Sequence, residues 1–221
     1  MINKYLKRAH ISERQFRRVL KLFSQDFEAT KIGQLTGISR ISINKIFKKL
    51  RLRILDLSNA ELKVNGEVEV DETYFGPTRV RGKRGRGASG KIPVIGILKR
   101  KGKVYTQIIN NCTRKELLPV IKGKVLEDSI IYTDSWKSYD GLVLNGYKHY
   151  RIHHKRNEFA RGKNHINGIE SFWSYMKRRL RKFNGIRKDQ FILHLKESEY
   201  RWNYKDKLYS KLLKILRNYP L

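Results

Sequence analysis

Three acidic residues stand where a carboxylate is costly unless a cation meets it. Asp71 ends an alternating apolar stretch that begins at residue 66, and Asp134 ends a second apolar stretch that begins at residue 130. Glu170 lies near the start of residues 165–173, which have helical spacing. A buried charge loses its hydration, so it needs an opposite charge or a metal ion. Taken alone, an Asp at the end of a strand is more often a turn residue or a helix cap.

Three converging carboxylates suit Mg²⁺, a hard cation that takes one or two protein carboxylates and completes its shell with water and phosphate. Two such ions about 3.5–4 Å apart can hold the attacking and leaving oxygens of an in-line displacement at phosphorus. Asp71, Asp134 and Glu170 are therefore predicted as the catalytic and metal-binding residues of a site for two Mg²⁺ ions, which Mn²⁺ can replace.

The elements that must position these acids follow from the hydrophobic periodicity. Alternating or short continuous apolar runs predict strands, and a period of 3.6 residues predicts a helix. Strand ends can converge, and a helix that docks on the sheet can bring the third acid. Three strands, a helix, further strands and then helices indicate an α/β fold with a mixed sheet flanked by helices. Strands are expected at 66–74, 92–98, 104–109, 129–133 and 147–152, and helices at 114–121, from 168 onward and at 191–202.

Residues 1–55 are predicted to form a separate all-helical domain. Apolar spacing predicts helices at 29–36 and 39–50, with Gly37 in the turn between them and Ser39 as the cap of the second. This is the helix-turn-helix arrangement, whose second helix enters the major groove of DNA. The same pattern also fits an ordinary helical hairpin with a solvated basic face. The outward-facing candidates for DNA contacts are Arg40, Asn44, Lys45 and Lys48.

The composition favours a nucleic-acid partner and excludes several other classes of protein. The chain has 50 Lys and Arg against 20 Asp and Glu, a net charge of +30, and a polyanion would offset the resulting self-repulsion. Hydrophobic residues make up 39% of the chain, enough for a folded core. A single cysteine, Cys112, excludes an intramolecular disulfide bond and a Cys-rich zinc site. No apolar run suits a signal peptide or a membrane span, so we expect a cytoplasmic protein with no membrane partner.

The spacing of the acids resembles that of a known superfamily. Thirty-five residues separate Asp134 from Glu170, and Lys177 follows Glu170 by seven positions, two helical turns along one face. This pattern resembles the DDE transposase and integrase superfamily, which has a ribonuclease H-like core. A closer resemblance, to ISXO2-like (IS1595-type) transposases of small bacterial insertion sequences, covers residues 20–205. The segments that carry it are residues 70–76, 132–134, 165–173, 177–178 and 191–203.

The resemblance implies a reaction in two displacements. The site would cut a phosphodiester at the end of the element, freeing a 3′-hydroxyl, and would then direct that hydroxyl at target DNA. Lys177 would neutralise a phosphate beside the site. Some relatives have Asn where others have the third acid, so Asn167 is a further catalytic candidate. Several relatives begin with a zinc ribbon that Cys112 alone cannot form, so recognition of the element ends is assigned to the helix-turn-helix.

Domain boundaries and partners follow from the same resemblance. The implied order is a helix-turn-helix domain at 1–55, a linker at 56–65, a ribonuclease H-like catalytic domain at 66–205 and a basic helical tail at 206–221. Double-stranded DNA is the expected partner, both as element ends and as target. Because transposition joins two DNA ends, a homodimer or a higher assembly on DNA is expected.

Two basic stretches are predicted to contact the DNA backbone. Residues 79–91 are rich in basic residues and glycine but lack the spacing of a P-loop, which argues against ATP binding. Residues 171–188 contain no acid, and their basic run would follow phosphates beside the catalytic helix. The candidates are Arg81, Lys83, Arg84 and Arg86 in the first stretch and Arg178, Arg179, Arg181 and Lys182 in the second.

The sequence therefore predicts a DNA transposase with an N-terminal helix-turn-helix and a ribonuclease H-like catalytic domain. Two alternatives stay open. A ribonuclease H-like nuclease without strand transfer would share the metal site, so only the reaction products distinguish it from a transposase. A non-catalytic helix-turn-helix regulator would bind DNA without needing the three acids.

Overall fold

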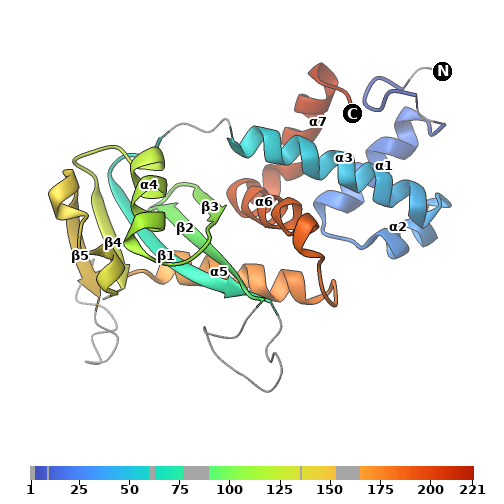
Figure 1. The fold of residues 1–221 in the computed structure, drawn as a ribbon. Coiled ribbons are helices and arrows are strands. Elements are labelled where there is room, and N and C mark those ends of the chain that lie inside the picture. Colours follow the sequence, from blue (N-terminus) through green and yellow to red (C-terminus); the bar gives the residue numbers. More distant parts are fainter. Residues whose placement is uncertain (1–2, 9, 60–62, 77–89, 135, 153–164) are drawn as a thin grey trace. The chain divides into compact units, whose positions relative to one another are not determined.

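The computed structural model describes residues 3–8, 10–59, 63–76, 90–134, 136–152 and 165–221 (Figure 1). The chain forms two compact units, one from residues 1–60 and 193–221 and the other from residues 61–192.

The second unit is built on a five-stranded mixed sheet with the strand order β3-β2-β1-β4-β5. The pairs β1–β2 and β2–β3 are antiparallel, whereas β1–β4 and β4–β5 are parallel. The predicted strands are therefore confirmed, with small shifts at their ends. The strands are β1 (Glu67–Phe75), β2 (Ile92–Lys99), β3 (Val104–Ile108), β4 (Ile130–Asp134) and β5 (Lys148–Ile152).

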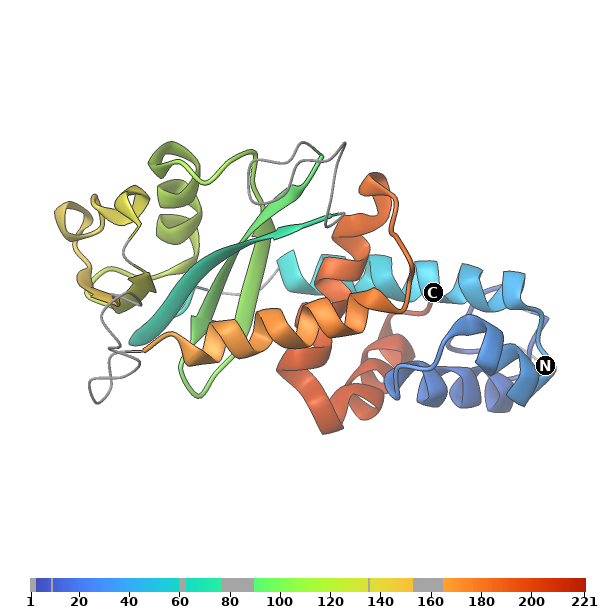
Figure 2. The same cartoon turned by 90° about the horizontal axis from the view of Figure 1, so that it is seen from below.

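Helices α4 (Arg114–Lys124) and α5 (Asn167–Arg181) cover opposite faces of this sheet, as the views in Figures 1 and 2 agree. Successive side chains of a strand point to opposite faces. Val68 and Val70 of β1 accordingly join a buried core that contains the apolar side chains of α4. Two short 3₁₀ helices, at 137–139 and 143–145, connect β4 to β5.

The residues of β1 that alternate with these valines carry carboxylates. Glu69 and Asp71 lie on the other face, where each accepts a hydrogen bond from α5. The strand thus separates an apolar core on one face from an acidic surface under a helix on the other. A mixed sheet of this order with helices on both faces confirms the predicted ribonuclease H-like fold class.

The first unit is all-helical. Apolar side chains from each of its α-helices, among them Phe16, Ile32, Leu50, Tyr200 and Leu212, form one buried core. Its helices are α1 (Glu13–Ser24), α2 (Ala29–Thr36), α3 (Arg40–Asn59), the part of α6 (Lys188–Tyr204) from residue 193 onward, a 3₁₀ turn (Lys205–Lys207) and α7 (Leu208–Asn218).

A tight turn joins α2 to α3, as predicted. Gly37 has a φ of 71°, a left-handed conformation that a residue without a Cβ adopts at little cost. The Ser39 hydroxyl oxygen accepts a hydrogen bond of 3.2 Å from the backbone N–H of Ser42 and so caps α3. The turn and the cap both follow from local sequence.

The compact units differ from the predicted domain boundaries. Helix α3 continues beyond residue 56, where a linker was expected, because Ile54 and Ser58 extend its buried face. The segment expected as a basic tail at 206–221 contains α7, whose Leu208 and Leu216 are buried in the core of the N-terminal helices. A helical tail was expected there, but the sequence of the tail does not reveal which helices cover its apolar face.

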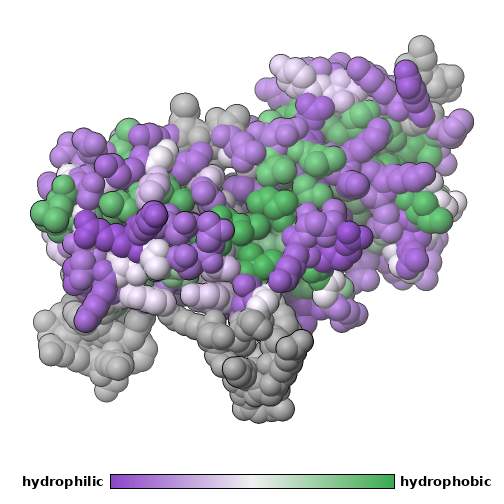
Figure 3. All heavy atoms as spheres, in the orientation of Figure 1, coloured by the Kyte–Doolittle hydropathy of each residue, from purple (hydrophilic) through white to green (hydrophobic). Residues whose placement is uncertain are grey.

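Hydrophilic side chains cover much of the face drawn in Figure 3, on both units. This distribution agrees with a chain of net charge +30. None of the helices in the described residues combines the length and the apolar character that spanning a membrane requires.

Candidate functional site

Asp71 and Asp134 lie on neighbouring parallel strands, Asp71 in the middle of β1 and Asp134 at the end of β4. Glu69 of β1 pairs with Tyr132 of β4, so the next residues on this face of the two strands are Asp71 and Asp134. Carboxylate oxygens of Asp71, Glu72 and Asp134 all lie within 4.8 Å of one another. The structure thus brings the two predicted acids together, although β1 does not end at Asp71 but continues to Phe75.

Glu72 belongs to this tight group, although it is not among the acids predicted to bind metal. Its side chain is buried, and the Tyr139 hydroxyl donates a hydrogen bond to Glu72 Oε2. Burial and the negative charge of Glu72 raise the pKa of Tyr139 well above its ordinary value, so this hydroxyl keeps its proton. The sequence shows only that Glu72 follows Asp71 in a strand. Its hydrogen-bond partner, Tyr139, lies in another segment of the chain.

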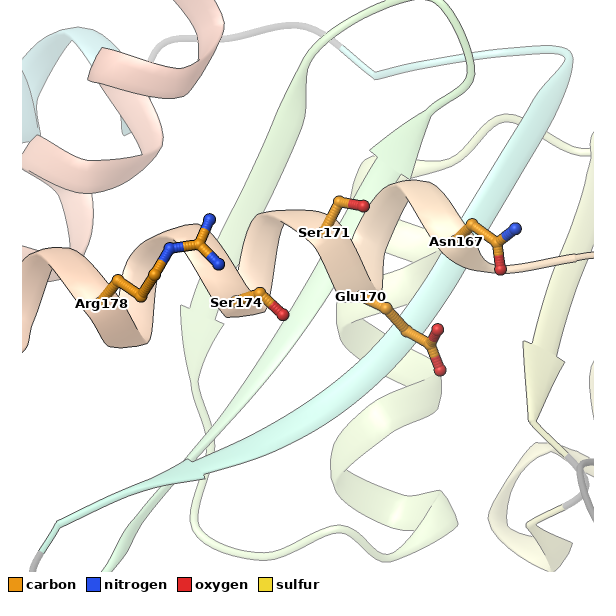
Figure 4. A pocket seen from close by; sticks show the side chains of 5 residues that line it. All are labelled: Asn167, Glu170, Ser171, Ser174 and Arg178. Carbon is orange, nitrogen blue, oxygen red and sulfur yellow. The ribbon is translucent and has the colours of Figure 1, made fainter.

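Glu170 is the third predicted acid, and it is exposed in the first turn of α5. It lies outside the tight group of acids, yet its negative charge is among those that raise the pKa of Asp71. Glu170 also lines an open groove of about 460 Å³ along α5 (Figure 4). The other lining residues are Asn167, Ser171, Ser174 and Arg178.

The electrostatics of the group fit a divalent cation. The pKa of Asp71 is raised to about 7, first by burial and then by the charges of Glu72 and Asp134, with a smaller effect from Glu170. Like charges this close resist joint ionisation. A hard cation such as Mg²⁺ prefers carboxylate oxygens and would offset their repulsion.

Trp173 of α5 orients Asp71. Its indole Nε1–H donates a hydrogen bond of 3.1 Å to Asp71 Oδ2. The side chain is buried, as the sequence predicts for a core residue, and it also has this polar contact. Gly96, which pairs with Asp71 on β2, makes room for the ring, because a Cβ at this position would lie 2.5 Å from Trp173 Cζ2.

The other site candidates on α5 divide by exposure. Lys177, Arg178 and Arg181 are exposed, as is Asn167 in the first turn. Arg179 was expected to contact DNA, but it is only 7% exposed, so we leave it out of the candidate interface. The guanidinium of Arg179 and the ammonium of Lys182 both lie over the ring of Phe183.

The remaining candidates lie on α3 and in a stretch that the structure does not describe. On α3 the polar candidates face outward, opposite the buried Ile43 and Phe47. The exposed α3 candidates are Arg40, Asn44, Lys45 and Lys48; Arg81, Lys83, Arg84 and Arg86 lie outside the described residues.

His149 of β5 contacts Thr133 Oγ1 at 2.8 Å, and burial and the charge of Arg151 lower the pKa of His149 to about 4.

The mixed sheet with helices on both faces defines a protein of the ribonuclease H-like fold class, with acids of β1 and β4 close together. The family comparison is more specific, because residues 63–203 match the ISXO2-like transposase domain. The chain belongs to this transposase family.

Two curated relatives are similar to this chain. An uncharacterized transposase-like protein of Haemophilus influenzae is 50% identical over 103 residues, which are 47% of this chain and 83% of that relative. An uncharacterized protein in transposable element ISH50 of Halobacterium salinarum is 28% identical over 191 residues, 78% of this chain and 64% of the relative. The chain therefore spans just under two thirds of the second relative.

Among solved structures, one similar chain is in the simian T-cell lymphotropic virus intasome in complex with PP2A regulatory subunit B56 gamma. It has a TM-score of 0.41 and 13% identity, and the match covers 85% of this chain and 69% of that one. A chain of the Mos1 strand transfer complex has a TM-score of 0.34 and 11% identity, over 90% of this chain and 74% of the other.

Proposed function

We propose that this protein is a DNA transposase that cleaves phosphodiester bonds at the ends of an insertion sequence and transfers the freed 3′-hydroxyl into target DNA. The observation that carries this proposal is the place of Asp71 and Asp134, side by side on one face of the sheet. Helix α5, with Glu170 in its first turn, lies against the same face. Membership of a transposase family gives these acids a reaction to perform.

In this proposal Asp71, Asp134 and Glu170 would hold two Mg²⁺ ions, which Mn²⁺ could replace. The bound ions would supply Lewis-acid stabilisation of the charge that develops at phosphorus. Trp173 holds Asp71 in place through the indole N–H. Water, in cleavage, and the DNA 3′-hydroxyl, in strand transfer, are the nucleophiles, so the protein forms no covalent intermediate.

The groove along α5 is suited to the DNA strand beside the scissile bond. The hydroxyls of Ser171 and Ser174 and the guanidinium of Arg178 line it, and all three groups can donate hydrogen bonds to phosphate oxygens. Lys177 is exposed on the same helix and would neutralise a phosphate near the metal ions. Asn167 lines the groove beside Glu170, where it can contact the same strand.

We further propose that α2 and α3 form a helix-turn-helix that recognises the element ends. The left-handed Gly37 and the Ser39 cap support this assignment. A helical hairpin with a solvated basic face would have the same cap, so DNA binding must be measured. The proposed partner is double-stranded DNA in a bacterial cytoplasm, bound by a homodimer or a higher assembly.

A strand-transfer assay tests the proposed function. Purified protein is incubated with Mg²⁺ or Mn²⁺, DNA carrying the sequences that flank its gene, and target DNA. Wild-type protein should produce joined products, and Asp134→Asn should reduce the rate about a thousandfold, or about 4 kcal/mol, because it removes a metal ligand. A matched control is Asp128→Asn, since Asp128 is exposed and has a φ of 64° that asparagine tolerates. This control should react like wild type.

The products separate the proposal from its alternatives. Cutting without joining would favour a ribonuclease H-like nuclease. Binding of the ends with neither reaction, and no effect of Asp134→Asn on binding, would favour a non-catalytic regulator.

A further inference from the structure

We propose that Glu69 is a positioning residue that sets the place of Glu170 relative to Asp71 and thereby the affinity of the site for divalent cations. This inference rests on the proposed function of the three acids. Glu69 contacts none of the reacting groups in that proposal. It acts through the first turn of α5, to which it is hydrogen-bonded.

Glu69 caps α5 from a neighbouring strand. The first N–H groups of a helix have no partner within the helix, and the residue before α5, Ile166, makes no side-chain capping bond. Glu69 Oε2 instead accepts a hydrogen bond of 2.9 Å from the backbone N–H of Ile169. A carboxylate is favoured at this end of a helix because the helix dipole is positive there. Glu69 is 1% exposed, so little water competes for the bond.

Arg100 holds the other oxygen of Glu69. Its Nε donates a hydrogen bond of 3.0 Å to Glu69 Oε1, and its Nη2 donates to the backbone oxygen of His165, just before α5. Its guanidinium also lies 3.8 Å from the centre of the Tyr132 ring on β4. Arg100 therefore ties together the end of β2, the strand of Asp134 and the entry to α5, with Glu69 in the middle.

Gly168 shows how closely α5 approaches this carboxylate. A Cβ at Gly168 would lie 2.8 Å from Glu69 Oε2 and 3.2 Å from Leu98 Cδ2. Glycine is unfavourable in a helix, so its presence here is explained by the close approach. The first turn of α5 can reach Glu69 only because residue 168 has no side chain.

Two hydrogen bonds then attach α5 to β1 on either side of Glu170. One joins Glu69 to Ile169, the residue before Glu170, and the other joins Asp71 to Trp173, about one turn further along. Without the first bond, α5 would be held to β1 through Trp173 and could change its angle. Glu170 would then shift relative to Asp71 and Asp134. Groups that orient metal ligands from outside typically change metal affinity about 10- to 100-fold when mutated.

The variant Glu69→Gln tests this inference, and Glu67→Gln is its matched control. Glu67 lies on the same strand and contacts the same arginine, at 3.6 Å, but no contact joins it to α5 in the described residues. Binding of Mn²⁺ to the protein alone and the Mg²⁺ dependence of cleavage would be measured for both variants. Glu69→Gln should weaken Mn²⁺ binding and raise the half-saturating Mg²⁺ concentration by about tenfold. Its rate at saturating metal and its DNA affinity should change much less. Glu67→Gln should match wild type in Mn²⁺ affinity, half-saturating Mg²⁺ concentration, rate at saturating metal and DNA affinity.

Glu69→Gln leaves the charge of Arg100 poorly paired, and the variant could therefore fail to fold. A second variant, Gly168→Ala, tests the inference in that case. Gly168→Ala keeps every charge and disturbs the approach of α5 to Glu69 and to its neighbour Leu98, so it should shift the Mn²⁺ affinity in the same direction. Thermal unfolding would confirm that each variant tested is folded.

Two outcomes distinguish failure of the inference from failure of the proposed function. Folded Glu69→Gln and Gly168→Ala proteins with wild-type metal dependence would overturn the role of Glu69. Wild-type protein that binds Mn²⁺ but neither cuts nor joins DNA would overturn the proposed function, and Mn²⁺ affinities would still decide the role of Glu69.

Discussion

The two units bury carboxylates in opposite ways. In the helical unit Glu197 is 1% exposed, and Arg51 and Arg201 donate hydrogen bonds to its two oxygens at 2.7 and 2.8 Å. In the sheet unit Asp71 and Asp134 lie close to other carboxylates, and within the described residues neither forms an ion pair with Lys or Arg. A buried acid is costly to separate from its cationic partner, whereas acids gathered as close together as Asp71 and Asp134 are suited to a metal ion.

The largest effect expected from this comparison is on stability. Glu197→Gln should lower the free energy of unfolding by about 3 kcal/mol, because it leaves two arginines with a neutral partner in a buried position. Arg201 also donates hydrogen bonds to the backbone oxygens of Phe23 and Ser24 at the end of α1, so its displacement would loosen that helix end. Denaturant unfolding in the presence of a chelator measures the difference.

Asp71→Asn should have the opposite effect under the same conditions. At pH 8, above the raised pKa of about 7, it removes one charge from a group of mutually repelling acids and keeps an oxygen that can accept from Trp173. Metal-free stability should therefore rise, or at least not fall, while activity is lost. A loss of stability as large as that of Glu197→Gln would contradict the view that these acids repel one another in the metal-free protein.

The third prediction concerns the pH dependence of stability. The pKa of Asp71 is raised from an ordinary value of 3.8 to about 7. The folded state therefore keeps a proton that the unfolded chain releases, and this contribution to stability falls as pH rises from 3.8 to 7. His149, whose pKa is lowered to about 4, acts in the opposite direction below its ordinary value of 6.5. His149 is present in both wild type and Asp71→Asn, so its contribution to the pH dependence of stability cancels when the two proteins are compared.

Thermal unfolding in chelator at pH 5 and pH 8 checks this expectation. Wild-type protein should lose more stability than Asp71→Asn between these pH values. Mg²⁺ should restore the loss at pH 8, because it would bind the ionised carboxylates. Parallel curves for the two proteins would show that Asp71 has an ordinary pKa.

The parts of the molecule that follow from sequence are those determined by short segments. The alternation in β1 predicts both the strand and the face of Asp71, and Gly37 and Ser39 predict the turn and cap of α3. The convergence of Asp71 with Asp134 was also expected, but the reason given for it was only half right: Asp134 ends β4, whereas β1 continues beyond Asp71 to Phe75.

The missed features depend on contacts between distant segments. Glu72 is hydrogen-bonded to Tyr139, and Glu69 to the backbone of Ile169, 100 residues further along the chain. A strand pattern shows that these glutamates are in a strand, but not what faces them. The packing of α7 on the N-terminal helices was missed for the same reason.

The smallest expected effect is on DNA binding by the helical unit. Lys45 is exposed on α3. If its ammonium contacts one phosphate, Lys45→Ala should make the negative slope of log K against log salt concentration less steep by about 0.9. Lys115→Ala is the control, because Lys115 is exposed on α4, on the face of the sheet opposite α5. A gel-shift titration with element-end DNA at several salt concentrations gives both slopes. Metal-dependent cleavage of non-specific DNA should be the same for both variants, since neither residue belongs to the acidic site. A Lys45→Ala slope equal to that of wild type would remove this residue from the proposed DNA interface.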